Sequence, residues 1–96
     1  MFYYVDILQS ISHKMLYIGF TQNLRERFRS HNANENQATK NRGPWKLIFY
    51  EAYLNKYDAL RREKYLKSTK GRTTTKTMLS EYFNEEQVIL VSGEDE

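Results

Sequence analysis

Two apolar stretches near the start of the chain, FYYVDIL at residues 2–8 and MLYIGF at residues 15–20, decide the fold. Both are dense in aromatic and β-branched residues, the types that favour strands. Residues 10–14 between them are polar and form a connection short enough for a turn. Because strands joined by so short a connection run in opposite directions, the two stretches are expected to form an antiparallel hairpin.

Helices and one further strand are expected after this hairpin. They are a helix over about 22–31, a strand over 45–52, a helix over about 56–68 and an amphipathic helix over about 75–84. Thr21 and Asn55 are the side chains expected to cap the first two helices. The polar segments 32–43 and 69–77 are expected to be loops, and the second of them is basic. This order of elements predicts a small α+β domain.

Length and residue usage exclude several classes of protein. The chain has 96 residues, which predicts one domain, expected over residues 1–84 with an acidic tail over 85–96. The chain has no cysteine, which excludes a disulfide scaffold, a cysteine-based zinc site and a thiol nucleophile. It has only two histidines, which excludes a multi-histidine metal site. No apolar run approaches the roughly 20 residues of a membrane span, and no signal peptide is recognisable. We therefore expect a cytoplasmic protein.

Charge is distributed unevenly along the chain. The formal net charge is only +3, from 15 basic and 12 acidic residues. Residues 1–80 hold all 15 basic residues and six of the acidic ones, a net +9, whereas residues 81–96 hold the other six acidic residues. A basic body with an acidic tail is typical of a protein that binds a phosphate backbone, although an ordinary solubilising surface gives the same outline.

Glu63 is out of place in the helix expected over about 56–68. At 100° per residue it lies about 40° from Ala59, within the apolar stripe that Ala59 and Leu66 define. A carboxylate on a core-facing stripe is costly unless it is paired or bound to a metal. The alternatives are a buried Glu–Arg ion pair and a carboxylate at the edge of the stripe that reaches water.

The helix expected over about 22–31 also has a charged residue close to its apolar stripe, because Arg27 lies at the edge of that stripe. His31 near the end of that helix is weak evidence by itself, since a histidine there also suits the helix dipole. The four glycines stand alone, so the chain has no P-loop and no Gly-x-Gly-x-x-Gly motif. Nothing supports a Ser-His-Asp triad.

Taken together, four segments resemble the GIY-YIG endonuclease domain in its short, single-domain bacterial form. YIG at residues 17–19 continues into FTQNLRERFRSH at residues 20–31, which is similar to the family pattern YIG-x-T-x-x-L-x-x-R-x-x-x-H. TKNRGPWKLI at residues 39–48 resembles the loop and third strand of these proteins, and ALRREKYLKS at residues 59–68 resembles the helix that carries their glutamate. The resemblance implies a three-stranded antiparallel sheet flanked by helices.

The resemblance also implies an activity, the metal-assisted hydrolysis of phosphodiester bonds in one step. By position, Glu63 would bind one divalent cation, Mg²⁺ with Mn²⁺ as a substitute, because Mg²⁺ accepts a single protein carboxylate alongside water and phosphate oxygens. Tyr17 would be the general base or would help to position it, assisted by metal-bound water or a nearby cation because a phenol is a weak acid. Arg27 would hold the scissile phosphate, and His31 would help to position water or phosphate. No organic cofactor is implied.

One position departs from the family pattern. The first half of the name motif ends in a tyrosine eleven residues before Tyr17, and here that residue is Asp6. Asp6 is either a second carboxylate that helps to bind metal or water, or the mark of a weak or inactive enzyme. Asp6→Tyr should raise cleavage if Asp6 is a defect and lower metal affinity if it is a ligand. The late polar residue of the family site is left open among Thr75, Lys76 and Asn84.

The sequence thus predicts a metal-dependent endonuclease that acts on DNA with low sequence specificity, or selects DNA by its structure. Five basic residues in or beside the two polar segments are expected to bind the phosphate backbone: Lys40, Arg42, Lys67, Lys70 and Arg72. The first alternative is a catalytically impaired nucleic-acid-binding module. The second is a protein-interaction domain whose acidic tail covers the basic face. Cleavage of DNA in Mg²⁺ separates the enzyme from the impaired module.

Overall fold

The computed structural model describes residues 1–36 and 39–85. The chain divides into two compact units, Met1–Lys64 and Tyr65–Glu96. In chain order the elements are β1 (Tyr3–Ser10), β2 (Leu16–Thr21), α1 (Leu24–Asn32), β3 (Trp45–Tyr53), α2 (Lys56–Lys67) and α3 (Thr69–Met78). The first unit contains the sheet, α1 and most of α2, and the second begins within the last turn of α2. The acidic tail expected over 85–96 lies, apart from its first residue, outside the described residues.

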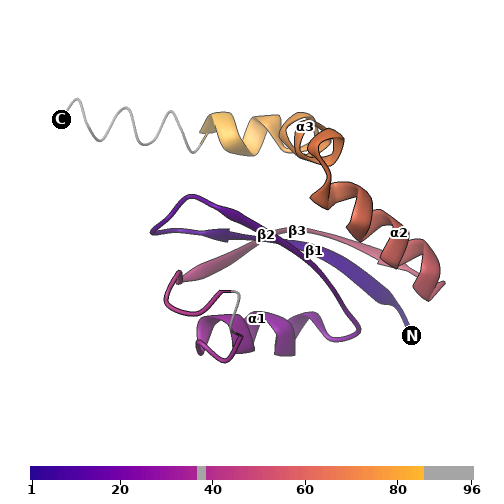
Figure 1. Ribbon diagram of the computed structural model, residues 1–96, viewed down its shortest axis with the longest axis horizontal. Coiled ribbons are helices and arrows are strands. Elements are labelled where there is room, and N and C mark those ends of the chain that lie inside the picture. The colour runs from indigo at the N-terminus through magenta and orange to yellow at the C-terminus, as the bar shows by residue number, and fades with distance from the viewer. Residues whose placement is uncertain (37–38, 86–96) are drawn as a thin grey trace. The chain divides into compact units, whose positions relative to one another are not determined.

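The sheet has the order β2-β1-β3, and both strand pairs are antiparallel (Figure 1). β1 is therefore the central strand, and all six of its residues from 5 to 10 are buried. Because successive side chains of a strand point to opposite faces, six buried residues in a row show that both faces of β1 are covered. A register shift between Ile7 and Leu8 interrupts the pairing of β1 with β3. The predicted α+β fold with a three-stranded antiparallel sheet is confirmed.

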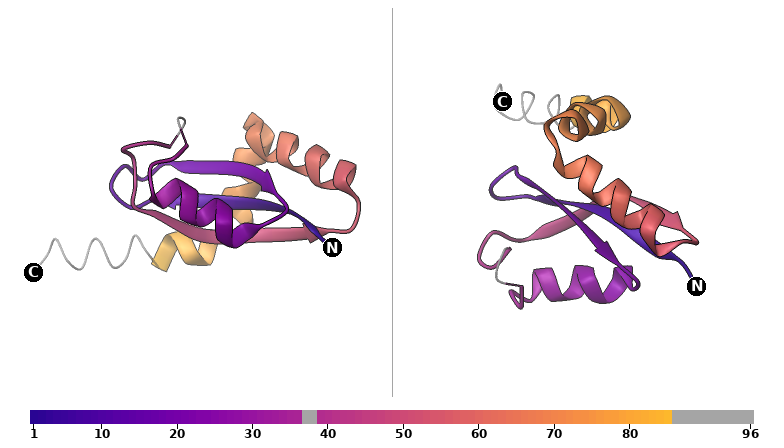
Figure 2. Two further views of the ribbon diagram at one scale, coloured as in Figure 1. Left: turned by 90° about the horizontal axis from the view of Figure 1, so that it is seen from below. Right: turned by 45° about the vertical axis from the view of Figure 1, so that its right-hand side comes forward.

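Helix α1 lies along one face of this sheet and contacts β1 and β3 (Figure 2). Thr21 was the expected cap of this helix, and that prediction is wrong, because the N-cap is Asn23, whose side chain accepts from the backbone N–H of Glu26. Thr21 is the last residue of β2 and is aligned with Tyr4 of β1. Its hydroxyl instead accepts from the backbone N–H of Asn23, which fixes the turn from strand to helix.

Residues 69–77 were expected to form a loop. That prediction is wrong, because they form most of α3 in the second unit. Ser68 is the N-cap of α3 and accepts from the backbone N–H of Gly71. A Cβ added at Gly71 would lie 2.0 Å from the carbonyl oxygen of Tyr65, so only glycine allows α3 to begin this close to the end of α2. The helix expected over about 75–84 is also wrong in its bounds, because α3 ends at Met78 and residues 80–85 are helical again after Leu79.

The search for membrane spans covered the described residues, and none of their helices combines the length and the apolar character that crossing a bilayer requires.

Candidate active site

The side chain of Arg27 reaches from α1 to the central strand and pairs with Asp6. Its Nε lies 2.5 Å from Asp6 Oδ2, and the two side chains are 12% and 1% exposed. Asp6 thus projects from the central strand on the face of the sheet that α1 covers. An ion pair this well buried loses its solvation, so removing either partner would leave the other group buried without compensation.

Gly19 provides the space for the Arg27 guanidinium. It is aligned with Asp6 across the β1–β2 pair. A Cβ added at Gly19 would lie 1.9 Å from Arg27 Nη2 and 2.3 Å from Cζ, so the guanidinium occupies the volume that any other residue would need. Tyr17, two residues earlier on the same strand, lies beneath Arg27 with its ring centroid 5.3 Å from Cζ, a cation–π contact. The tyrosine and the glycine of the YIG sequence therefore both form the seat of Arg27.

His31 also holds Arg27. Its Nε2 lies 2.8 Å from Arg27 Nη1, and its Nδ1 lies 2.5 Å from the hydroxyl of Thr39. An arginine only donates hydrogen bonds, so Nε2 must accept, and the ring proton of the neutral histidine is on Nδ1, donated to Thr39. Burial and then the charge of Arg27 lower the pKa of His31 from 6.5 to about 4, which keeps this neutral form at physiological pH.

Trp45 and Thr39 complete the buried end of the site. The indole Nε1 of Trp45 donates to the backbone carbonyl of Thr39 at 3.3 Å, and its ring lies against Tyr17 and His31 with centroids 6.3 and 6.5 Å away. Asn32 holds the backbone of Trp45 by two hydrogen bonds of 2.7 and 3.1 Å. Thr39 is 0% exposed and Trp45 is 3% exposed, so the polar segment between α1 and β3 is anchored in the interior.

Sequence reasoning missed three of these residues as parts of the site: Gly19, Thr39 and Trp45. All three were quoted only as letters of a motif. The one available signal was that the single tryptophan of the chain stands at the junction of a polar segment and a strand.

Glu63 lies half-buried on α2, so its side chain is neither fully in the core nor fully in water. Its negative charge, after burial, is one of the causes that raise the pKa of Asp6, and the hydrogen bond and charge of Arg27 oppose that rise. The Glu63 carboxylate is therefore close enough to Asp6 to act on it electrostatically. The neighbouring Arg62 pairs with Glu51 of β3 at 2.9 Å.

Two polar atoms of the site are buried without a hydrogen-bond partner among the described residues, Arg27 Nη2 and Asp6 Oδ1. Buried polar atoms in native proteins nearly always have a partner, so two such atoms on one ion pair are unusual. The site can therefore offer a hydrogen-bond donor and an acceptor to a bound group.

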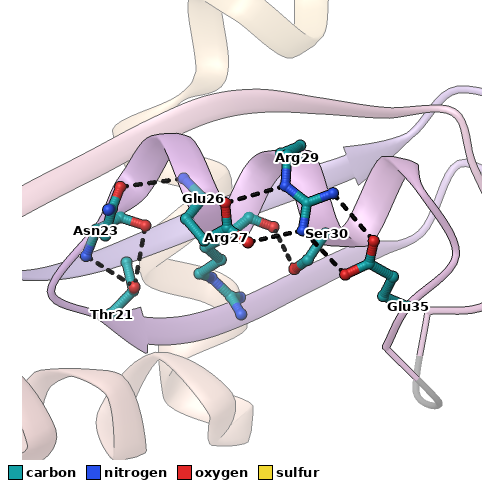
Figure 3. Close-up of polar contacts among 7 residues, drawn as sticks. All are labelled: Thr21, Asn23, Glu26, Arg27, Arg29, Ser30 and Glu35. Atoms are coloured by element: carbon teal, nitrogen blue, oxygen red, sulfur yellow. Dashed lines mark hydrogen bonds and ion pairs between the residues drawn. The ribbon is translucent and has the colours of Figure 1, made fainter.

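The outer face of α1 carries a different set of charges. Arg29 is exposed and pairs with Glu26 at 2.7 Å and with Glu35 at 2.9 Å. Figure 3 shows that Arg27 points away from this cluster, although it lies only two residues from Arg29. Exposed ion pairs of this kind contribute little to stability. Arg29 is therefore a surface residue of α1 and not part of the candidate site.

The five basic residues expected to bind DNA are all exposed. Lys40 and Arg42 belong to the segment between α1 and β3 in the first unit. Lys67, Lys70 and Arg72 belong to the end of α2 and to α3 in the second unit, on helices and not on the predicted loop. The three candidates for the late polar residue differ in burial: Thr75 is 1% exposed, whereas Lys76 and Asn84 are exposed.

The lowered pKa of His31 predicts a pH-dependent stability. Between pH 6.5 and 4 the unfolded chain binds a proton on this histidine and the native protein does not, so stability falls as the pH falls. The expected loss is about 3 kcal/mol from pH 7 to pH 4. Urea unfolding at pH 7 and pH 4 should show that His31→Gln loses less stability between the two pH values than the native protein does. The raised pKa of Asp6 acts in the opposite direction, but it does so equally in the native protein and in His31→Gln. Equal losses of stability in the two proteins would contradict the prediction.

The Thr39 hydroxyl is predicted to stabilise the site through His31. Thr39→Val keeps the shape of the side chain but leaves the buried Nδ1–H of His31 without an acceptor, which costs about 1–3 kcal/mol. Thr39→Ser keeps the hydroxyl and serves as the matched control. Urea unfolding of both variants checks the prediction, which is contradicted if valine is tolerated as well as serine.

Comparison with known proteins places these residues in a family. The model of the GIY-YIG catalytic domain matches residues 2–77. A UPF0213 protein of Clostridium perfringens is 36% identical over 84 residues, which cover 86% of this chain and 89% of that protein. A UPF0213 protein of Limosilactobacillus reuteri is 35% identical over 80 residues, which cover 80% and 82%. The solution NMR structure of a UPF0213 protein from Bacillus halodurans is similar with a TM-score of 0.52 and 27% identity, covering 81% of this chain and 85% of that one.

Proposed function

The chain belongs to the GIY-YIG catalytic domain family, and from this premise we propose that it is a metal-dependent endonuclease that hydrolyses phosphodiester bonds in DNA. Family membership implies a phosphodiester hydrolase that binds nucleic acid. The use of a divalent cation, the choice of DNA and a low sequence specificity are parts of the proposal. The relatives' names assign no activity.

The observation that supports this function best is the buried Nη2 of Arg27, which has no partner among the described residues. A phosphate oxygen is a charged acceptor and would complete the hydrogen bonds of this guanidinium. The other nitrogens of Arg27 are fixed by Asp6 and His31, so the group is already oriented before a phosphate arrives. A donor held in place in this way stabilises developing negative charge without reorganisation.

The remaining side chains have roles that follow from their contacts. Tyr17 lies under the guanidinium and is the candidate to activate or orient the attacking water. With both ring nitrogens bonded inside the protein, His31 is proposed to position Arg27. Lys40 and Arg42 are exposed beside Thr39 and are proposed to contact the phosphate backbone.

The carboxyl groups of the site fit a hard divalent cation. Glu63 supplies a half-buried carboxylate, and Asp6 Oδ1 is a buried oxygen with no partner in the described part of the chain. The described residues contain no cluster of three or more His, Asp or Glu side chains able to hold a metal, so the protein would provide few ligands. Mg²⁺ tolerates this, because it keeps several waters and binds substrate phosphates. When bound, such an ion would supply positive charge for the phosphate oxygens.

Incubation of the purified protein with supercoiled, linear and branched DNA tests the proposed function. Cleavage is expected in Mg²⁺ or Mn²⁺ and not in EDTA. Arg27→Lys keeps the positive charge but loses the planar fork, so it should cleave far more slowly than the native protein. If the native protein binds these DNAs and cuts none of them, the enzyme proposal fails.

Asp6 favours a second candidate function, a nucleic-acid-binding module with impaired catalysis. Its carboxylate accepts from Arg27 Nε, a nitrogen that would otherwise be available to bind the substrate. Such a module would bind DNA with an affinity that falls as salt rises and would leave it uncut. Asp6→Tyr would then restore cleavage, whereas an unchanged lack of cleavage would show that Asp6 is not the cause.

A further inference from the structure

An aromatic cluster of Phe2, Tyr4 and Tyr50 lies on the sheet beside the candidate active site. The ring centroids of Phe2 and Tyr4 are 6.4 Å apart, and those of Tyr4 and Tyr50 are 5.9 Å apart with the rings nearly perpendicular. Phe2 is 44% exposed and Tyr50 is 53% exposed. These rings therefore contact one another and still present a large part of their surface to solvent.

The strand register places this cluster next to Arg27. Tyr50 of β3 is aligned with Asp6 of β1, whose carboxylate binds Arg27. Residues aligned across an antiparallel pair project to the same face, with Cβ atoms roughly 5 Å apart. Tyr4 precedes Asp6 by two residues and projects to that face too. The aromatic cluster and the guanidinium thus lie on one face of the sheet, with Asp6 of the central strand between Tyr50 of β3 and the guanidinium over Gly19 of β2.

We propose that this cluster is a stacking surface for an unpaired base of the DNA whose phosphate lies at Arg27. The inference rests on the proposed function and names its substrate class: DNA with unpaired nucleotides beside the cleaved bond, such as a flap, a fork or a single strand. Aromatic side chains bind single strands by stacking, which is tolerant of sequence because every base has a flat face. Bases within a duplex are stacked on their neighbours and do not present that face.

The charge of the chain favours a nucleic acid over a protein as the occupant. Residues 1–80 carry a net +9, and the cluster adjoins a guanidinium with a buried donor that has no partner among the described residues. A single strand of DNA can place a base on the tyrosines and a phosphate at the arginine, because only the central strand β1, which carries Tyr4 and Asp6, lies between Tyr50 and the guanidinium. An apolar protein surface would use the rings but not the donor.

The test measures binding without cleavage. Glu63→Gln is the background, and a fluorescent base, 2-aminopurine, is placed at the unpaired position of a flap or inside a duplex of the same sequence. Stacking on the cluster should change the fluorescence of the flap, and Tyr50→Leu in this background should remove the change and weaken flap binding about tenfold. Tyr57→Leu is the matched control, because Tyr57 is 71% exposed and lies on α2, outside the cluster.

Three outcomes would overturn the proposal. They are an equal effect of Tyr50→Leu on flap and duplex, an equal effect of the Tyr57 control, and a change in self-association instead of DNA binding. Cleavage by the protein with native Glu63 separates this inference from the proposed function. Cleavage of flaps that Tyr50→Leu leaves unchanged refutes the stacking surface alone, whereas flap binding that depends on Tyr50 without any cleavage refutes the enzyme alone.

Discussion

Replacing Glu63 with glutamine is expected to lower DNA cleavage about a thousandfold while DNA binding and the fold are retained. The change keeps the size of the side chain and removes the negative charge that would hold a divalent cation. Loss of the ion would remove several kcal/mol of stabilisation of the charge that develops on the phosphate, and about 4 kcal/mol corresponds to a thousandfold. Because Glu63 is half-buried and not in the core, the fold should tolerate the amide.

Three measurements check the Glu63 prediction. Cleavage rates are compared over a range of Mn²⁺ concentrations, Mn²⁺ binding is measured by calorimetry, and urea unfolding reports the fold. Glu81→Gln is the matched control, because Glu81 is exposed and should change none of the three. Cleavage that persists in Glu63→Gln would show that another group holds the ion or that the activity is a contaminant.

The alanine variant of Gly19 is expected to be folded but catalytically defective. Its Cβ would lie 1.9 Å from Arg27 Nη2, so the guanidinium would have to leave its place over the strand. Arginine is flexible enough to move, but the displacement breaks the ion pair to Asp6 and the hydrogen bond to His31. Buried groups that lose their partners cost about 1–3 kcal/mol, and cleavage should fall by about a hundredfold because the phosphate donor is misplaced.

Gly43→Ala is the matched control for Gly19→Ala. The atom nearest to a Cβ at Gly43 is Trp45 Cδ1 at 3.3 Å, which a shift of a few tenths of an ångström relieves. Thermal unfolding and cleavage rates of the two variants should therefore differ clearly. If Gly19→Ala cleaves DNA as fast as Gly43→Ala, the seat of Arg27 over Gly19 is not needed for catalysis.

The helices show where local sequence is sufficient and where it is not. The start of α2 was predicted correctly, because the Asn55 side chain accepts from the backbone N–H of Tyr57 within the same short stretch. The cap of α1 was not, because Thr21 and Asn23 both suit a cap. The choice depends on the pairing of Thr21 with β1, which a local pattern does not contain. For α3, the basic and polar character of residues 69–77 favoured a loop, and the helix depends on the close approach that Gly71 allows.

The sequence by itself predicted the three strands and the α+β class, because apolar periodicity is a local property of the chain. Its resemblance to a known family supplied the family and the five residues proposed for the catalytic site. Only the tertiary structure decided that Asp6, the residue that departs from the family pattern, binds Arg27. These residues are 21 positions apart, and their contact depends on the β1–β2 register and on the docking of α1. The same docking buries Thr39 against His31. A buried charge or ring nitrogen needs a partner, and the fold determines which one is within reach.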